Sequence, residues 1–464
     1  MSYLIQNSHL ISLNPANESE VGAVSLTPVS HLPQILTQAQ TAQKTWQALS
    51  PDVRIQQLSH ALLQAESHAQ ALGRLISEEM GKPLSAGIGE ARYSLQHARE
   101  SLQDMQQALA PEILTEDGRQ SQIHHVARGV VGVITPWNFP VNLSLNALVP
   151  ALAAGNSVIY KPSEHTPLTG KLLAALLNAN LPEQLLQTVY GTGDVGAALS
   201  AAAVDMVAFI GSQATGQKIM AAQSVHLNPL ILEMGGKDAM VVLEDADLEA
   251  AAAHAVNGAL RNSGQVCVSI ERIFVVESVM ASFVDKIKAH MAAFKVGDPA
   301  DSSTQMGPMV SQFQREQVLK QLEDARQKGA HILGGDVPES KGFYLNPALV
   351  THVSDDMLLM QEETFGPVIA LQQVSGVEEA LEKANQLAYG LGASLWSQSP
   401  QAAKWALQLE AGMVGVNQGA HGVSGTPFVG NKKSSLGHFG GADGARQFTQ
   451  PRVLSQALVG QGQV

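Results

Sequence analysis

The sequence predicts an α/β protein built on doubly wound parallel sheets, and three observations support that prediction. From residue 130 onward, short apolar runs alternate with helical patterns, an arrangement that produces parallel sheets with right-handed crossovers. The chain has 464 residues, too many for a single core, so we expect more than one domain. Its 41 glycines, many beside strand-like runs, suit a protein with functional turns.

Composition narrows the possible functions. A net charge of −13 would repel a phosphate backbone, so we expect no nucleic acid partner. No apolar run is long enough to cross a membrane, and the first residues lack the basic and apolar regions of a signal peptide. With a single cysteine the chain cannot form an intrachain disulfide, which indicates a reducing, cytoplasmic location.

The region before residue 108 is predicted to be mainly helical. Residues 3–30 predict a small hairpin around an NPANE turn. Leucines recur at helical spacing between about residues 32 and 107, and Pro51 and Pro83 divide that stretch into three predicted helices.

Residues 120–129 predict an exposed strand or arm, with which residues 452–459 can pair. His124 and His125 are adjacent on this strand and point to opposite faces, so they cannot easily share one metal ion. We therefore expect both histidines to be structural and predict no metal site.

The rest of the chain alternates between strands and helices. We expect strands at 130–137, 157–164, 185–191, 205–211, 273–276, 389–397 and 411–419. We expect helices at 147–156, 169–180, 193–202, 211–223, 246–260, 282–295, 313–329 and 377–388. Residues 228–252 predict two further strands around the turn Gly235-Gly236, and residues 359–374 a turn followed by a strand. Parallel sheets of this kind bind ligands at the carboxyl ends of their strands.

The only cysteine, Cys267, lies between the predicted helix 246–260 and the strand 273–276. A free cysteine is often an inert buried residue. The polar turn formed by residues 262–265 argues for the other interpretation, because segments that connect helices and strands frequently carry function. We interpret Cys267 as a nucleophile, on condition that another group activates it.

Two other residues have suitable chemistry for such a site. Glu233 lies between an apolar strand and Gly235-Gly236, so burial should raise its pKa towards the range of a general base. Asn138, between Pro136 and Pro140, is an uncharged donor on a rigid loop and can stabilise an oxyanion. The alternatives are a solvated glutamate at a strand end and an ordinary turn asparagine.

A cofactor site is suggested by the string GSQATG, residues 211–216, where a strand ends and a helix begins. Backbone N–H groups there can bind a pyrophosphate, although the spacing differs from the usual dinucleotide fingerprint. Lys161 and Glu164 end the strand at 157–164, and a carboxylate there accepts hydrogen bonds from ribose hydroxyls but repels a 2′-phosphate.

Taken together, strings along nearly the whole chain resemble the aldehyde dehydrogenase superfamily in order and spacing: ITPWNFP, KPSEHTP, FIGSQATG, LEMGGKDA, GQVC, EETFGPV and PFVGNKKSSLG. The resemblance implies two doubly wound Rossmann-type α/β domains plus a β oligomerisation arm, in a homodimer or homotetramer. The implied NAD(P)-binding domain is 1–111 with 128–235, the catalytic domain 236–434, and the arm 112–127 with 445–464.

The same resemblance implies roles for individual residues. Cys267 would attack the aldehyde carbonyl, Asn138 and the Cys267 N–H would form the oxyanion hole, and Glu233 would activate water for thioester hydrolysis. NAD or NADP would contact Thr135, Pro136, Trp137, Lys161, Ser163, Glu164, Gly211, Ser212, Gly216, Glu363 and Phe365. Because of Glu164 we expect NAD to be preferred.

The substrate is less well defined by sequence. The string GMVGVNQG and Arg261 resemble succinate-semialdehyde dehydrogenases, in which three residues hold the substrate carboxylate. At the other two positions this chain has Asn146 and Gly422, so Arg261 is the one carboxylate anchor that remains. The alternative is that Arg261 merely caps the end of a helix. We take Arg261, Val266 and Val268 as candidate substrate contacts.

Two smaller departures from the family's motifs, at Met234 and at Val429-Gly430, remove no chemical group that the reaction needs. Two rival functions stay open: a CoA-acylating aldehyde dehydrogenase, which would not need Glu233, and a catalytically silent protein on the same fold. The presence of Glu233 argues against the first, and retention of Cys267, Glu233 and Asn138 together argues against the second.

Overall fold

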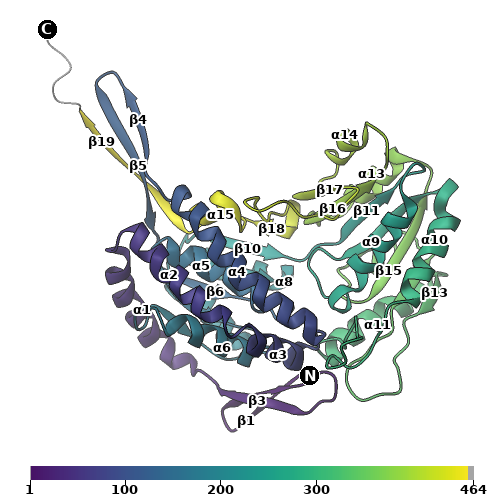
Figure 1. The fold of residues 1–464 in the computed structure, drawn as a ribbon, viewed down its shortest axis with the longest axis horizontal. Helices are drawn as coiled ribbons and strands as arrows, with labels where there is room; N and C mark the ends of the chain where they lie inside the picture. The colour runs from purple at the N-terminus through teal and green to yellow at the C-terminus, as the bar shows by residue number, and fades with distance from the viewer. Residues whose placement is uncertain (1, 458–464) are drawn as a thin grey trace.

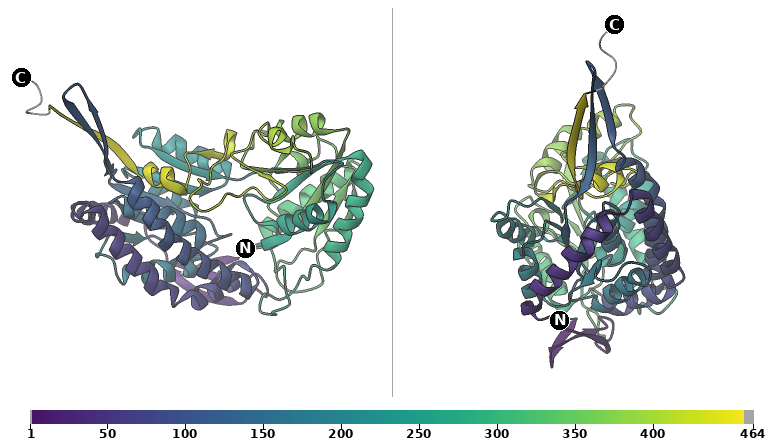
Figure 2. Two further views of the ribbon diagram at one scale, coloured as in Figure 1. Left: turned by 45° about the horizontal axis from the view of Figure 1, so that its top comes forward. Right: turned by 90° about the vertical axis from the view of Figure 1, so that its left-hand side faces the viewer.

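The computed structural model describes residues 2–457, and it has three parts: two α/β lobes and a narrow β arm projecting from the first lobe (Figure 1). A small N-terminal sheet lies on the side of the first lobe opposite the arm in all three views (Figures 1 and 2). This architecture confirms the predicted fold class of two doubly wound α/β units with an arm.

The N-terminal residues form a three-stranded antiparallel sheet rather than the predicted hairpin. Its strands are β1 (Tyr3–Gln6), β2 (His9–Leu13) and β3 (Glu20–Ser25), in the order β1-β2-β3. The NPANE turn connects β2 to β3. The additional turn consists of Asn7 and Ser8, whose φ angles are 49° and 61°. It contains no glycine or proline, so it gave no sequence signal.

Four helices, not the predicted three, occupy the region before residue 109. They are α1 (Leu32–Gln47), α2 (Pro51–Glu66), α3 (Ala69–Met80) and α4 (Leu84–Ala108). The unpredicted break follows α2 at Ser67, whose hydroxyl donates to the Gln64 carbonyl at 2.7 Å. A serine bonded to its own backbone in this way competes with continuation of the helix.

The first lobe is organised around a six-stranded sheet in the order β18-β10-β9-β6-β7-β8. Five strands are parallel: β6 (Val130–Ile134), β7 (Ser157–Lys161), β8 (Leu186–Thr188), β9 (Met206–Gly211) and β10 (Leu230–Met234). Only β18 (Ser435–Leu436) is antiparallel. The crossover helices are α5 (Asn142–Ala153), α6 (Pro167–Asn178), α7 (Gly193–Ala201) and α8 (Gln213–Gln223). The strand order reverses beside β6, and such a switch point is where open α/β sheets bind ligands.

The second lobe contains a seven-stranded sheet in the order β13-β14-β15-β12-β11-β16-β17. Its strands are β11 (Asp238–Val242), β12 (Ile270–Val276), β13 (His331–Gly334), β14 (Ala348–Thr351), β15 (Val368–Val374), β16 (Gly392–Trp396) and β17 (Met413–Val416). The helices are α9 (Leu248–Leu260), α10 (Glu277–Ala292), α11 (Gln312–Gln327), α12 (Leu358–Gln361), α13 (Val377–Asn385) and α14 (Ala402–Ala406). The unpredicted β13 and β14 have only four residues each.

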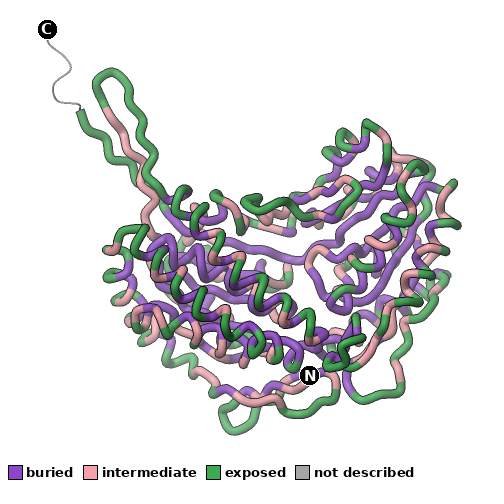
Figure 3. The backbone as a smooth tube through the Cα atoms, viewed as in Figure 1, coloured by how far each residue is buried: buried purple, intermediate pink, exposed green. Residues whose placement is uncertain are grey.

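Burial follows the central strands of both sheets (Figure 3). Every residue of β6, β7, β11 and β12 is buried. Parallel strands covered by helices on both faces have this property, so the continuous apolar runs in the sequence were a reliable signal.

The arm is a three-stranded antiparallel sheet in the order β19-β5-β4. It comprises β4 (Glu112–Glu116), β5 (Arg119–Ala127) and β19 (Thr449–Ala457), with helix α15 (Gly441–Gln447) before β19. The predicted pairing of the C-terminal strand with the 120s strand is confirmed, with Val453 opposite Ile123. Residues 458–464 of the predicted arm lie outside the described residues.

Candidate active site

Cys267 lies on the connection between α9 and β12, as predicted. Three consecutive residues of this connection, Asn262, Ser263 and Gly264, have φ angles of 56°, 59° and 70°. A side chain at Gly264 would place its Cβ 2.0 Å from the carbonyl oxygen of Gly366, so only glycine fits. The left-handed turn reverses the chain and leaves Cys267 half-buried on the wall of a cavity between the lobes.

The strain of this turn is offset by side-chain hydrogen bonds. Ser263 Oγ donates to the Gly307 carbonyl at 2.9 Å. Gln265 is fully buried; its Nε2 donates to the Asn262 carbonyl at 3.0 Å and its Oε1 accepts from the Val310 N–H at 2.9 Å. Left-handed residues other than glycine cost roughly 1–2 kcal/mol each, so the nucleophile loop depends on these bonds.

Asn138 reaches the same cavity from the loop after β6. Its Nδ2 donates to the Gln265 carbonyl at 3.1 Å, which fixes the orientation of the amide. The Asn138 carbonyl accepts from Asn262 Nδ2 at 3.1 Å. Because an amide nitrogen carries two hydrogens, the second remains for a ligand oxygen beside Cys267.

A buried ion pair supports the Asn138 loop from behind. Lys82 Nζ bonds both Glu90 and the Asn138 carbonyl, the latter at 3.0 Å. The other Glu90 oxygen accepts from the N–H groups of Val141 and Asn142, at 3.1 and 3.4 Å, where α5 begins. Lys82 Nζ also lies 3.8 Å from the centre of the Phe139 ring, a cation–π contact.

Glu233, at the end of β10, is 3% exposed and its Oε1 has no hydrogen-bond partner among the described residues. Burial raises its pKa to about 8; the Cys267 thiol beside it lowers that value and Asp238 raises it. Burial and the carboxylates of Glu233, Asp238 and Glu363 in turn raise the pKa of Cys267 above its usual value. The thiol is therefore surrounded by acids, and Glu233 lies beside it.

A second cavity continues the Cys267 cavity along the carboxyl ends of β6, β7 and β9. The two have volumes of about 270 and 480 Å³ and share five lining residues: Pro136, Trp137, Ile210, Gly211 and Ser212. They form one long groove that starts near Lys161 and Glu164 and ends at Cys267. A dinucleotide, long and narrow with polar groups along its length, fits this shape.

The far end of the groove carries the predicted ribose contacts. Glu164 lies 3.2 Å from Lys161 Nζ. Burial alone would raise the pKa of Glu164, but the charges of Lys161 and His165 and the hydrogen bonds to the carboxylate together outweigh burial and lower the pKa. Ser212 caps the start of α8, where its Oγ accepts from the Thr215 N–H at 3.4 Å, and both residues line the groove, so this helix end can bind an anionic group.

The predicted cofactor contacts line the groove with one exception, Gly216. A Cβ there would lie 2.5 Å from the Met234 sulfur, so this glycine permits close packing of α8 on β10 instead. Glu363 and Phe365 line the Cys267 end of the groove. The Phe365 ring meets Trp137 edge to face at 5.6 Å, which closes the groove across the two lobes.

The predicted substrate contacts are not brought together. Arg261 is exposed, with its guanidinium 5.6 Å from the Phe139 ring, and neither Arg261, Val266 nor Val268 lines a described cavity. A third cavity of about 420 Å³ opens between α4, α5 and the 421–428 loop. Its wall includes Asn146 and Gly422, the two positions singled out by sequence, together with Tyr93, His97, Glu100, Asp104, Asn142 and His421.

Three glutamines of the site were not predicted. Gln314, Gln317 and Gln321 of α11 line the Cys267 cavity. Their spacing of three and four residues places them on one helix face, a polar stripe where a core-facing helix usually has apolar residues. That interruption was a signal in the sequence.

No group of three or more metal-ligating side chains occurs among residues 2–457, and no helix there is long and apolar enough to cross a membrane. What the fold does contain is a nucleotide-shaped groove at a sheet switch point, ending at a thiol, a buried carboxylate and an amide donor. These features are typical of a dehydrogenase that uses a cysteine.

The chain belongs to the aldehyde dehydrogenase family, whose family model matches residues 5–454. It is 34% identical to aminoaldehyde dehydrogenase 2, peroxisomal, of Pisum sativum over 98% of this chain and 93% of that protein. It is also 34% identical to a "Probable succinate-semialdehyde dehydrogenase [NADP(+)]" of Sinorhizobium fredii, over 90% of this chain and 87% of that one. The crystal structure of PnpE in complex with nicotinamide adenine dinucleotide superimposes with a TM-score of 0.94 at 30% identity, covering 98% of this chain and 95% of the other. The chain is accordingly an NAD(P)-dependent oxidoreductase that acts on an aldehyde.

Proposed function

We propose that this enzyme oxidises an aldehyde to the free carboxylic acid, with Cys267 as nucleophile, Asn138 as oxyanion donor and Glu233 as general base. The observation that carries the proposal is that all three line one cavity at the end of the dinucleotide groove. Lys161, Glu164, Ser212, Glu363 and Phe365 would hold the cofactor, whose nicotinamide supplies the hydride acceptor.

In the proposed reaction, Cys267 Sγ attacks the carbonyl carbon after Glu233 takes its proton. Asn138 Nδ2 and the Cys267 N–H donate to the resulting oxyanion. Loss of hydride from the same carbon leaves a thioester on Cys267. Glu233 releases the thiol proton to solvent and then accepts a proton from water, which attacks the thioester and releases the acid.

NADH formation with a panel of aldehydes, measured with and without CoA, tests this function. Formation of the free acid without CoA supports it. Turnover that depends on CoA would instead support an acylating enzyme, and the absence of turnover with every aldehyde would support a silent protein.

We further propose a preference for NAD, supported by the ionised Glu164 beside the predicted ribose site. The NADP(+) in the Sinorhizobium relative's printed name makes this worth testing directly. Glu164→Gln should reduce the NAD/NADP ratio of kcat/KM by about tenfold, because it removes a charge that repels a 2′-phosphate. A higher kcat/KM with NADP in the parent enzyme would contradict the proposal.

For the substrate we propose a semialdehyde such as succinic semialdehyde, supported by Arg261, six positions before the nucleophile, whose guanidinium lies 5.6 Å from the ring of Phe139, the residue after Asn138. Arg261→Ala should lower kcat/KM for the semialdehyde about tenfold and leave a neutral aldehyde of equal length unaffected. Arg261→Lys serves as the matched control that keeps the charge.

A second candidate is an aminoaldehyde. The described acidic residues of the third cavity, Glu100 and Asp104, are accompanied there by no lysine or arginine, which favours a cationic substrate. Glu100→Gln and Asp104→Asn would then reduce turnover of an ω-aminoaldehyde, whereas a semialdehyde enzyme would tolerate both.

The predicted domain boundaries, the homodimer or homotetramer and the cytoplasmic location remain proposals. Exposed apolar residues on the arm support its role in assembly, among them Ile113, Leu114, Val453 and Leu454. Sedimentation analysis of the chain with and without residues 445–464 tests the oligomer, and cell fractionation tests the location.

A further inference from the structure

The segment Glu363–Thr364–Phe365, which we call the clamp segment, is held at nearly every backbone polar atom. Gln314 Nε2 donates to the carbonyls of Thr364 and Phe365 at 3.3 and 3.2 Å. Gln321 Nε2 donates to the Glu363 carbonyl at 3.2 Å. Of the three N–H groups in the segment, those of Thr364 and Phe365 have a single partner in common.

That partner is Glu271. Its Oε2 accepts from the Thr364 N–H and its Oε1 from the Phe365 N–H, both at 2.8 Å. Phe365 has a φ of 49°, an unfavourable conformation for an aromatic residue. Bidentate capture of consecutive N–H groups by one carboxylate stabilises this conformation, because charged acceptors form the stronger hydrogen bonds.

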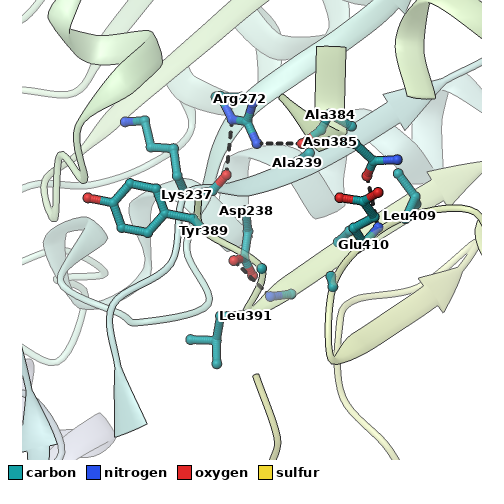
Figure 4. A pocket seen from close by; sticks show the side chains of 14 residues that line it. Lys237, Asp238, Ala239, Arg272, Ala384, Asn385, Tyr389, Leu391, Leu409 and Glu410 are labelled. Atoms are coloured by element: carbon teal, nitrogen blue, oxygen red, sulfur yellow. Dashed lines mark hydrogen bonds between the residues drawn. The ribbon is translucent and has the colours of Figure 1, made fainter. Parts of the chain in front are cut away.

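Lys237 completes the arrangement. Its Nζ bonds Glu271 Oε2 at 2.6 Å and Thr364 Oγ1 at 2.7 Å, and no part of its side chain is exposed. Glu271 belongs to β12 and Lys237 directly precedes β11, so both come from the central strands of the second lobe. Figure 4 shows how this end of the sheet is anchored: the Lys237 carbonyl accepts from Arg272 Nε at 3.0 Å.

We propose that Lys237 and Glu271 are positioning residues that hold the clamp segment in the conformation that binds the nicotinamide half of the cofactor. They act through Glu363 and Phe365 and do not line the groove themselves. The inference rests on the proposed binding of NAD(P) by Glu363 and Phe365. It predicts that cofactor affinity depends on two residues buried behind the site.

The test compares Glu271→Gln with the double variant Lys237→Met/Glu271→Leu. A buried pair replaced by apolar residues often retains stability, whereas removal of one partner leaves an uncompensated charge. The double variant should therefore have nearly the parent Tm, and both variants should bind NAD about tenfold more weakly in calorimetric titration.

Hydrolysis of p-nitrophenyl acetate provides a second measurement, because acylation of Cys267 by an ester needs no cofactor. In the double variant this rate should change much less than the dissociation constant of NAD. An unchanged NAD dissociation constant in the double variant would overturn the inference, as would a parallel tenfold loss of ester hydrolysis. Failure of the proposed function would look different, since the parent itself would then neither bind NAD nor hydrolyse the ester.

Discussion

Cys267 lies between two loops that are supported in different ways. The first lobe presents Asn138 on a loop with prolines at positions 136 and 140 and with Lys82 and Glu90 behind it. The second lobe presents the clamp segment, which has one proline after it and depends on Lys237 and Glu271. Both devices are buried Lys–Glu pairs that bind backbone atoms.

The difference lies in how much each loop depends on its pair. Proline fixes φ covalently, so the Asn138 loop retains much of its shape without help. The clamp segment contains a left-handed phenylalanine, Phe365, whose backbone N–H is held by a hydrogen bond to Glu271 and not by a proline. We therefore expect the cofactor side of the site to be more sensitive to loss of its pair than the oxyanion side.

The largest effect should come from a change at Cys267, which lies between the two loops. Cys267→Ala should lower aldehyde oxidation by at least about 10⁴-fold, because the chain has no other thiol. NADH absorbance measures the loss, and calorimetry should show unchanged NAD binding. Near-normal oxidation by this variant would contradict the mechanism.

Glu233→Gln should separate the two half-reactions. Steady-state turnover should fall about 100-fold while a burst of NADH, one per active site, persists, because a base is needed most in the water step. In the parent, deacylation should increase with pH through about 8, as Glu233 ionises, and this dependence should vanish in the variant. Stopped-flow traces across the pH range measure both; a variant without a burst would show that Cys267 cannot lose its proton without Glu233 and that the water step is not the one most sensitive to the base.

The smallest effect should come from the oxyanion-side pair and tests the comparison itself. The double variant Lys82→Met/Glu90→Leu should lower ester hydrolysis only about threefold and leave NAD binding unchanged. This variant should therefore affect mainly ester hydrolysis, whereas Lys237→Met/Glu271→Leu should affect mainly NAD binding. A larger loss on the oxyanion side than on the cofactor side would show that the prolines do not carry the rigidity we assign to them.

The sequence predicted the parts of the molecule that short-range patterns control. The apolar runs of β6, β7 and β9 and the string around Cys267 were sufficient to find the sheet and the nucleophile loop. The break at Ser67 was missed because a serine inside a helical pattern is compatible with continuation of the helix, and only its bond to Gln64 shows otherwise.

The site features that the sequence did not predict depend on contacts between residues far apart in the chain. In the sequence, Glu271 and Lys237 look like ordinary residues at strand ends. Only the fold brings Glu271 to the Thr364 and Phe365 amides and Lys237 to Glu271. Gly216 matched a cofactor motif but packs against Met234. Arg261 matched a substrate motif, yet its side chain lies over Phe139 outside the described cavities.

The close approach of Gly264 to the Gly366 carbonyl has a consequence for how such enzymes diversify. The turn that presents the thiol and the segment that follows the clamp touch through bare backbone, so a change at either position would disturb the distance between sulfur and nicotinamide. The third cavity is built from α4, α5 and the 421–428 loop, none of which belongs to that seam. If the third cavity admits the aldehyde, as in the aminoaldehyde proposal, mutations there would change which aldehyde enters without altering the reaction, and selection for new substrates would act on one set of elements while the other stays constant.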